Sequence, residues 1–222
     1  MTMKLRPLFT LLLFVVSIGI LVWIYYAATR APKTSPPNMW QEVVADLEVC
    51  SRYKFIKANQ YDHFALVADE EMAVASAQLF RAMAYAARIQ EKNCADAIVR
   101  LGGRYAPPSK IVVFHSTTAD NIDRSVAYEQ YNRQLGGDKA VRRALKHGNR
   151  YAARTLVWAA AGDRVHLQLL ERHRQTIDSG AEGSGGYLIC PTCGNIYTTV
   201  DYDTFCPFCL TDGKQFIRIE TR

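Results

Sequence analysis

Four cysteines near the C-terminus form two C-x-x-C pairs. Cys190 and Cys193 make the first pair, Cys206 and Cys209 make the second, and twelve residues separate the two. A C-x-x-C turn brings two thiolates within reach of one metal ion, and two such turns complete a tetrahedral site. The spacing fits either structural zinc or a single iron. Two disulfides are the alternative, but tandem C-x-x-C pairs favour a metal.

The segments around these cysteines have the composition of short strands. Tyr187-Leu188-Ile189 precedes the first pair and Phe216-Ile217-Arg218-Ile219 follows the second, and we expect both to join a small sheet. A module of residues 187–222 is too small to fold on its apolar core alone, so a bound metal would stabilise it. Four glycines and two serines in residues 179–186 predict a flexible tether before it.

The composition of the whole chain limits the kinds of function that it can have. The chain has 222 residues, 49% of them hydrophobic, and a formal net charge of +6, which allows one large or two small domains. The sequence has no block of five like charges and no basic stripe with interleaved aromatic residues, so we expect no nucleic-acid partner. The remaining cysteines, Cys50 and Cys94, lie in helical patterns and are interpreted as small buried side chains.

Residues 8–27 are uncharged and mostly apolar. Twenty helical residues span about 30 Å, the thickness of the hydrocarbon layer. A cleaved signal peptide is the alternative, but the run is longer than its usual apolar region and no good cleavage site follows. We therefore expect a single-pass membrane anchor within residues 1–38, which end in a proline-rich linker. A small excess of positive charge before the run favours an extracytoplasmic soluble part.

Residues 39–178 have the periodicity of helices. One apolar stripe runs from Trp40 and another begins after Ala68, and the glycines at 102–103 end the second helix. Residues 102–120, which include strand-like Ile111–Phe114, form a long crossover.

A third helix is expected to open near Thr117, with a kink at Gly136 and Gly137, and a fourth to follow the break at residues 147–149. Two helical hairpins joined by a long crossover predict a four-helix bundle.

This bundle, followed by a four-cysteine module, resembles the rubrerythrin family, which joins a ferritin-like di-iron bundle to a rubredoxin-like iron domain. The resemblance covers about residues 40–220 and is most specific in the four-cysteine module. It implies a mainly α fold: a ferritin-like four-helix bundle, here with an N-terminal transmembrane helix, and a small rubredoxin-like β module. The helical residues that match the family pattern are Asn59, Tyr61, Phe64, Ala65, Leu79, Phe80, Asn121, Ile122, Ala127, Tyr128 and Glu129.

The resemblance also indicates where di-iron ligands would lie, and the first hairpin lacks them. Ferritin-like sites need a Glu from each of two helices and a Glu-x-x-His from each of the other two. Lys54 stands where the first helix should supply Glu. Ala87 and Gln90 stand at the Glu and His of the second helix.

The second hairpin keeps part of the ligand set. The third helix retains Glu129, with Asn132 in place of a further Glu, and the fourth retains the motif as Asp163-x-x-His166. These three residues leave a mononuclear metal site as one interpretation, since two carboxylates and a histidine can hold Fe(II), Mn or Zn.

The other interpretation is a protein counter-ion. Lys54 lies on the apolar stripe of its helix, and we take it as the only cation of the stripe in the first hairpin. Buried carboxylates need a cation, so we expect Lys54 to replace one iron and pair with Glu129 or Asp163. Gln90 and His166 should face the same centre, with Gln90 able to hydrogen-bond there.

Three functions follow from these interpretations. The resemblance implies peroxide reduction fed by the rubredoxin-like iron, but the missing ligands stop us from carrying this activity over. The first hypothesis is a membrane-anchored electron carrier or redox sensor with one iron on four cysteines and an unidentified redox partner. The second is a zinc-ribbon interaction module near a membrane, and the third is a mononuclear-metal enzyme acting on peroxide. The resemblance further implies a homodimer, in which the module approaches the bundle of the partner.

Overall fold

The computed structural model describes residues 16–25, 39–134, 137–178 and 185–219. The chain divides into two units, Met1–Asn38 and Met39–Arg222. Within the first unit residues 16–25 are helical, whereas the remainder of the expected anchor at 8–27 and the proline-rich linker lie outside the described residues. In the described part of the chain, no helix is both long enough and apolar enough to cross a membrane.

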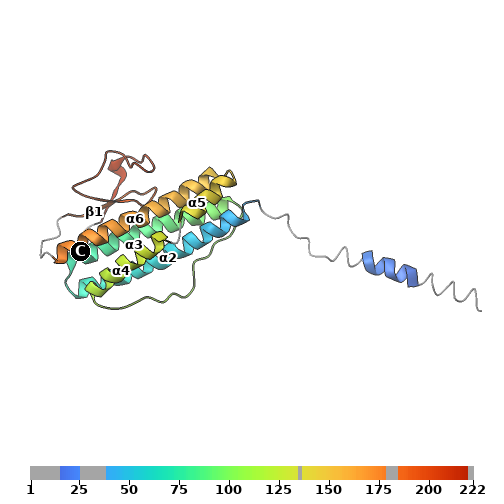
Figure 1. The fold of residues 1–222 in the computed structure, drawn as a ribbon, viewed down its shortest axis with the longest axis horizontal. Coiled ribbons are helices and arrows are strands. Elements are labelled where there is room, and N and C mark those ends of the chain that lie inside the picture. The colour runs from blue at the N-terminus through green and yellow to red at the C-terminus, as the bar shows by residue number, and fades with distance from the viewer. Residues whose placement is uncertain (1–15, 26–38, 135–136, 179–184, 220–222) are drawn as a thin grey trace, which may run out of the picture. The chain divides into compact units, whose positions relative to one another are not determined.

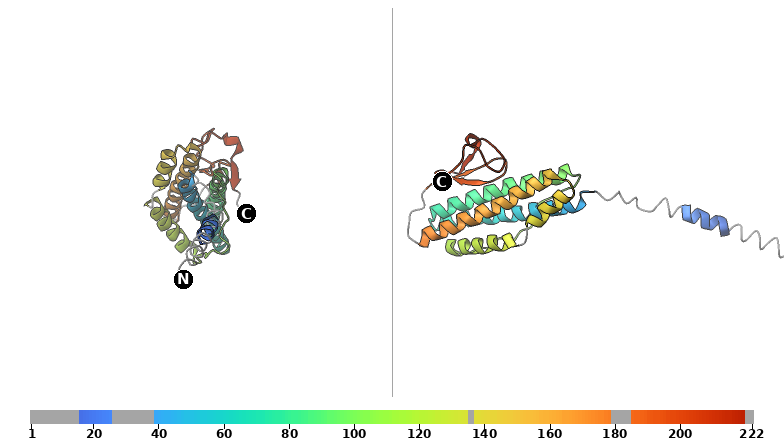
Figure 2. Two further views of the ribbon diagram at one scale, coloured as in Figure 1. Left: turned by 90° about the vertical axis from the view of Figure 1, so that its right-hand side faces the viewer. Right: turned by 45° about the horizontal axis from the view of Figure 1, so that its top comes forward.

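The second unit is a helical bundle that carries a small sheet (Figures 1 and 2). Its helices are α2 (Gln41–Glu70), α3 (Val74–Arg100), α4 (Thr118–Gln134), α5 (Gly137–Lys146) and α6 (Arg150–Asp178). The expected third helix is thus two helices, which follow one another along the bundle (Figure 2). Residues 135–136, between these two helices, lie outside the described residues, and Gly137 begins α5. Glycine is a poor helix former because its backbone loses the most freedom on folding, which fits a helix boundary at this position.

Two of the expected helix boundaries coincide with glycines in the left-handed conformation. Gly102, after α3, has φ of 79°, and Gly148, between α5 and α6, has φ of 71°. The amide of Gly103 then donates to the carbonyl of Ile98 at 2.9 Å, which closes the last turn of α3.

The strand-like segment of the crossover is not a strand. Gln60 on α2 accepts a hydrogen bond from the Phe114 amide at 2.7 Å and donates one to the Phe114 carbonyl at 2.8 Å. A side-chain amide therefore satisfies both backbone groups of Phe114, which a neighbouring strand would otherwise pair. The prediction failed here because β-branched composition does not show whether a partner strand is available.

The C-terminal sheet has three short antiparallel strands in the order β2-β1-β3. β1 (Tyr187–Ile189) and β3 (Ile217–Ile219) were expected, while β2 (Ile196–Thr198) was not. Ile189 pairs with Ile196 on one side and with Ile217 on the other.

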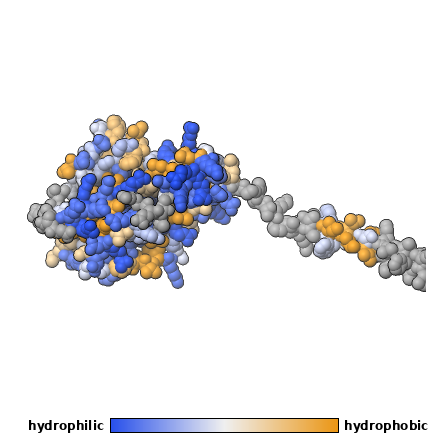
Figure 3. Space-filling view, in the orientation of Figure 1, coloured by the Kyte–Doolittle hydropathy of each residue, from blue (hydrophilic) through white to orange (hydrophobic). Residues whose placement is uncertain are grey.

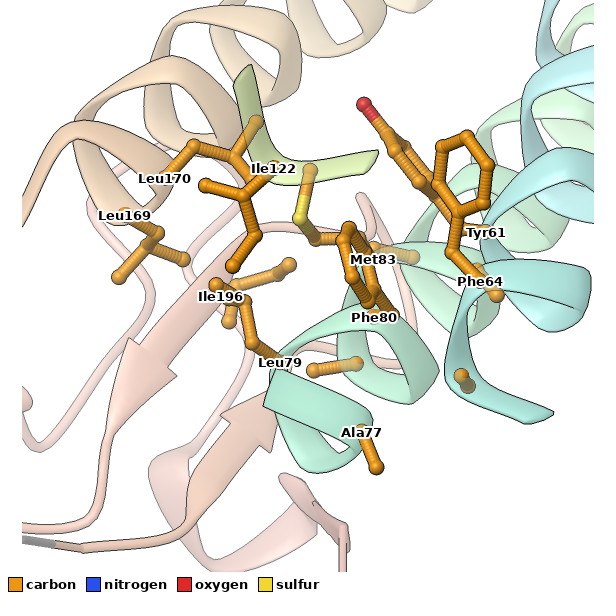
Figure 4. Close-up of a cluster of buried hydrophobic side chains, with 14 of the residues drawn as sticks. Tyr61, Phe64, Ala77, Leu79, Phe80, Met83, Ile122, Leu169, Leu170 and Ile196 are labelled. Atoms are coloured by element: carbon orange, nitrogen blue, oxygen red, sulfur yellow. The ribbon is translucent and has the colours of Figure 1, made fainter. Parts of the chain in front are cut away.

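The sheet shares its core with the bundle. Ile196 of β2 belongs to the same buried cluster as Leu79 of α3 and Leu170 of α6 (Figure 4). Other members of this cluster are Tyr61, Phe64, Phe80, Met83 and Ile122. The four-cysteine module is thereby packed on the bundle of its own chain.

Candidate metal centre and buried charge cluster

The four sulfurs of the C-x-x-C pairs converge. Cys190 Sγ lies 3.4 Å from Cys209 Sγ, and Cys193 Sγ lies 3.5 Å from Cys206 Sγ. All four sulfurs lie within 4.8 Å of one another, and all are free thiols. The disulfide interpretation is wrong, because a disulfide requires sulfurs about 2.05 Å apart. Four thiols at this spacing fit a tetrahedral metal site.

Both pairs sit in the same kind of turn. In the first, the Gly194 amide donates to the Cys190 carbonyl at 3.0 Å, and in the second the Leu210 amide donates to the Cys206 carbonyl at 2.8 Å. Gly194 has φ of 74° and Leu210 has φ of 64°, so each turn ends in a left-handed residue. Because the two turns have the same geometry, each directs its two sulfurs toward the same point.

Two hydroxyl groups contact sulfurs of the second C-x-x-C pair. The Tyr197 hydroxyl donates to Cys206 Sγ at 3.1 Å, and Thr211 Oγ1 lies 3.1 Å from Cys209 Sγ. A hydrogen bond from Cys193 lowers the pKa of Cys190 to about 4, so this thiol ionises readily. Hydrogen bonds to sulfur are among the features that tune the reduction potential of iron–thiolate centres.

A second cluster, of four charged side chains, lies inside the bundle. Lys57 Nζ is 2.6 Å from Glu129 Oε1 and also pairs with Asp163. Lys54 Nζ is 2.7 Å from Asp163 Oδ1 and donates to the Ala159 carbonyl at 2.9 Å. Two ammonium groups thus face two carboxylates, and we call these four residues the charge cluster.

The contact between Lys54 and Asp163 is the one that the sequence predicted, but Lys54 is not the only cation. Lys57 is equally buried, at 1% exposure. The sequence could have indicated this second lysine, because residues three apart on a helix share a face. Tyr61, one turn further along α2, donates to Glu129 Oε1 at 2.7 Å and was likewise not assigned this role.

The charges in the cluster determine which groups are ionised. Burial raises the pKa of Glu129 and of Asp163, but the neighbouring ammonium groups outweigh it and hold both below their ordinary values. Burial lowers the pKa of Lys57, but Asp163 and Glu129 outweigh it and raise the pKa overall. Burial also lowers the pKa of His166, so its ring is neutral near pH 7.

The three residues of the mononuclear interpretation do come together. Ligand atoms of Glu129, Asp163 and His166 lie within 4.8 Å of one another, and His166 Nδ1 is 3.5 Å from Glu129 Oε1. Lys57, however, contacts both carboxylates. The Lys57 ammonium therefore binds the same carboxylate oxygens that a metal ion would require as ligands.

Gln90 faces a different partner from the one expected. Its Nε2 donates to the Gly194 carbonyl at 3.3 Å and its Oε1 has no partner among the described residues. The expected hydrogen bond to the charge cluster is not found there. A Cβ added at Gly162 would lie 1.9 Å from Gln90 Nε2. Gln90 therefore lies between Gly162, which precedes Asp163, and Gly194, which follows Cys193.

Two further hydrogen bonds join the module to the bundle. Asn93 Nδ2 donates to the Thr192 carbonyl at 2.8 Å, and Trp158 Nε1 donates to the Phe208 carbonyl at 3.1 Å. Each acceptor lies inside one C-x-x-C pair. The bundle helices α3 and α6 thus hold both cysteine turns directly.

Comparison with solved structures addresses the fold as a whole. A mixed-valence state of nigerythrin matches with a TM-score of 0.71 and 22% identity, over 85% of this chain and 90% of that one. The chain has the fold of nigerythrin, a rubrerythrin-family protein. The all-ferrous, fully reduced state of nigerythrin matches with a TM-score of 0.69 and 23% identity over the same shares. No protein-family model and no curated protein sequence matches the chain.

Two bacterioferritins also match, over a smaller share of this chain than nigerythrin does. The bacterioferritin of Desulfovibrio desulfuricans has a TM-score of 0.59 and 16% identity, over 65% of this chain and 86% of that one. Mycobacterium tuberculosis bacterioferritin has a TM-score of 0.56 and 18% identity, over 67% and 91%. The predicted architecture, a ferritin-like bundle with a C-terminal four-cysteine module, is confirmed at the level of the fold.

Proposed function

We propose that this chain is a membrane-anchored redox protein that binds one iron at Cys190, Cys193, Cys206 and Cys209. The observation that carries the proposal is the convergence of four free thiols within 4.8 Å. Nigerythrin, which shares the fold, is described in mixed-valence and all-ferrous states, and this favours iron over zinc. An iron held by four thiolates would supply one-electron transfer between ferric and ferrous states.

The bundle, in this proposal, is a scaffold without a di-iron centre. Lys54, Ala87 and Gln90 offer none of the carboxylate or imidazole ligands of a ferritin-like site. The two ammonium groups of the charge cluster balance Glu129 and Asp163 instead. Peroxide reduction at a di-iron centre is therefore not part of the proposed function.

Metal analysis of the purified chain, combined with its visible spectrum, tests both halves of the proposal. We expect one iron per chain and a visible absorption that bleaches on reduction. The Cys193→Ser/Cys206→Ser variant should lose both. A colourless protein with one zinc per chain would favour the interaction module, and two or more irons beyond the four-cysteine iron would show that the bundle holds a metal centre.

We further propose a location and an assembly for the chain. The exposed side chains of the helix at residues 16–25 include Leu21, Trp23 and Tyr25, and apolar residues cover much of the face of this segment that Figure 3 shows. That composition supports an anchor over residues 8–27. The small excess of positive charge before this run favours a soluble part outside the cytoplasm. We also propose a homodimer, to be tested by light scattering at micromolar concentration, where a monomeric mass would reject it.

A further inference from the structure

Two cysteines outside the four-cysteine module lie in contact. Cys50 on α2 and Cys94 on α3 are free thiols, and Cys94 Sγ donates to Cys50 Sγ at 2.9 Å. Disulfide formation would require the sulfurs to approach by about a further 1 Å. The interpretation as small buried side chains holds for Cys94, which is fully buried, whereas Cys50 is only half-buried.

Cys50 is reached from a cavity of about 580 Å³ between α2, α5 and α6. The same cavity is lined by Tyr53, Lys54 and Asp163, whereas Cys94 is not among its lining residues. A small molecule entering the cavity would therefore meet Cys50 and not Cys94, whose Sγ lies 2.9 Å from Cys50 Sγ.

The surroundings distinguish the two thiols chemically. The hydrogen bond from Cys94 lowers the pKa of Cys50, burial opposes this, and the Lys54 charge lowers it further. The same hydrogen bond, together with burial, raises the pKa of Cys94. Because the thiolate is the reactive form of cysteine, Cys50 is suited to be the attacking group and Cys94 the second thiol.

We propose that Cys50 and Cys94 form a redox-active dithiol that reduces hydrogen peroxide and closes as a reversible disulfide. The Cys50 thiolate attacks one peroxide oxygen, the O–O bond breaks, and the released hydroxide takes up a proton to leave as water. Cys50 is then a sulfenic acid. Cys94 Sγ attacks the Cys50 sulfur, the S–O bond breaks, and a second water leaves. One peroxide is reduced to two waters while two thiols are oxidised to one disulfide.

Peptide mapping of the full chain in detergent can follow this reaction without interference from the metal site. Trypsin places Cys50 in peptide 34–52 and Cys94 in peptide 93–100, and it leaves the four module cysteines together in peptide 175–214. After one equivalent of hydrogen peroxide and alkylation of the remaining thiols, we expect peptides 34–52 and 93–100 to be cross-linked. Dithiothreitol should restore both alkylated peptides.

Single variants establish the order of the two thiols. In Cys94→Ser, peroxide should leave Cys50 as a sulfenic acid that dimedone labels, because no second thiol can resolve it. In Cys50→Ser, Cys94 should stay unlabelled. The cross-link in the native chain should form at least about ten times faster than in the same chain unfolded in urea, since the fold lowers the pKa of the attacking thiol.

Three results would overturn the proposal. One is full alkylation of both peptides in the peroxide-treated native chain, a measurement that needs no variant to fold. Another is a cross-link that forms no faster in the folded chain than in urea. The third is equal dimedone labelling of Cys94 in Cys50→Ser and of Cys50 in Cys94→Ser.

Discussion

Lys57 Nζ lies 2.6 Å from Glu129 Oε1 in the interior of the bundle, where neither side chain is more than 1% exposed. Glu129 has no other lysine partner among the described residues, whereas Asp163 contacts both Lys54 and Lys57. The two lysines are therefore not equivalent, although they lie on the same face of α2.

This difference predicts unequal effects of their removal. Lys57→Met should lower the free energy of unfolding by about 3–5 kcal/mol, because it leaves Glu129 as a buried charge without a cation. Lys54→Met should cost about 1–3 kcal/mol, since Asp163 keeps Lys57 and mainly a hydrogen bond is lost. Urea unfolding of both variants makes the comparison. A larger cost for Lys54→Met would show that Lys54, as the sequence alone suggested, is the principal counter-ion.

Restoring the ligand pattern of a ferritin-like site should require removal of the second lysine as well. We expect iron in the bundle only when Lys54→Glu, Ala87→Glu, Gln90→His and Asn132→Glu are combined with Lys57→Ala. With Lys57 retained, its ammonium stays between the carboxylates. Iron per chain, measured against the four-cysteine iron as an internal reference, distinguishes the two variants, and equal iron in both would show that Lys57 does not block the site.

Gly162 is predicted to be required for the contact between α3 and α6 at Gln90. Alanine normally stabilises a helix interior relative to glycine by about 1 kcal/mol. Gly162→Ala should instead destabilise by about 1–3 kcal/mol, because the new methyl group would meet the buried Gln90 amide. Thermal unfolding of Gly162→Ala/Gln90→Ala against Gln90→Ala provides the matched control, because Gly162→Ala should no longer destabilise once the Gln90 amide is absent. Stabilisation by Gly162→Ala alone would contradict the close approach.

The free energy of unfolding should fall when the pH is lowered from 7.5 to 5. Burial depresses the pKa of His166 and of His173, so the unfolded state binds more protons as the pH drops below about 6.5. The depressed pKa values of Glu129 and Asp163 remove further stability below about pH 4, near their ordinary values.

Urea unfolding at pH 7.5 and pH 5 measures the histidine part of this dependence. His166→Gln should make the decline between the two pH values smaller, since one of the two buried rings is then missing. Equal stability of the native chain at both pH values would contradict the assignment of neutral buried histidines. At the alkaline end, the raised pKa of Lys57 preserves its contribution until the pH passes above the ordinary lysine value of about 10.4.

Deletion of residues 1–33 should release the protein from membranes. The remaining chain includes the whole unit Met39–Arg222, whose core is formed by its own helices and sheet. Sedimentation of membranes from cells that express the full or the shortened chain tests the anchor. The full chain should pellet and the shortened chain should stay in the supernatant, and pelleting of a folded shortened chain would mean that another surface binds the membrane.

Local spacing was enough to predict several parts of this protein from its sequence. The C-x-x-C pairs specify their turns within four residues each, and the periodicity of α2, α3 and α6 specifies which face of each helix is buried. Gly102 and Gly148 mark helix ends because their left-handed conformation is a local property. A helical bundle and the convergence of the four sulfurs were predicted from these short-range features, and the resemblance to the rubrerythrin family added the ferritin-like architecture.

The tertiary structure decided several side-chain contacts that the sequence did not predict. Lys57 and Glu129 are 72 positions apart, and Cys50 and Cys94 are 44 positions apart. Helical periodicity places each of these residues on a face, but it does not give the height at which neighbouring helices pack. The packing of the helices brought two lysines against two carboxylates and the Cys94 sulfur against the Cys50 sulfur. It also directed Gln90 toward the cysteine module instead of the charge cluster.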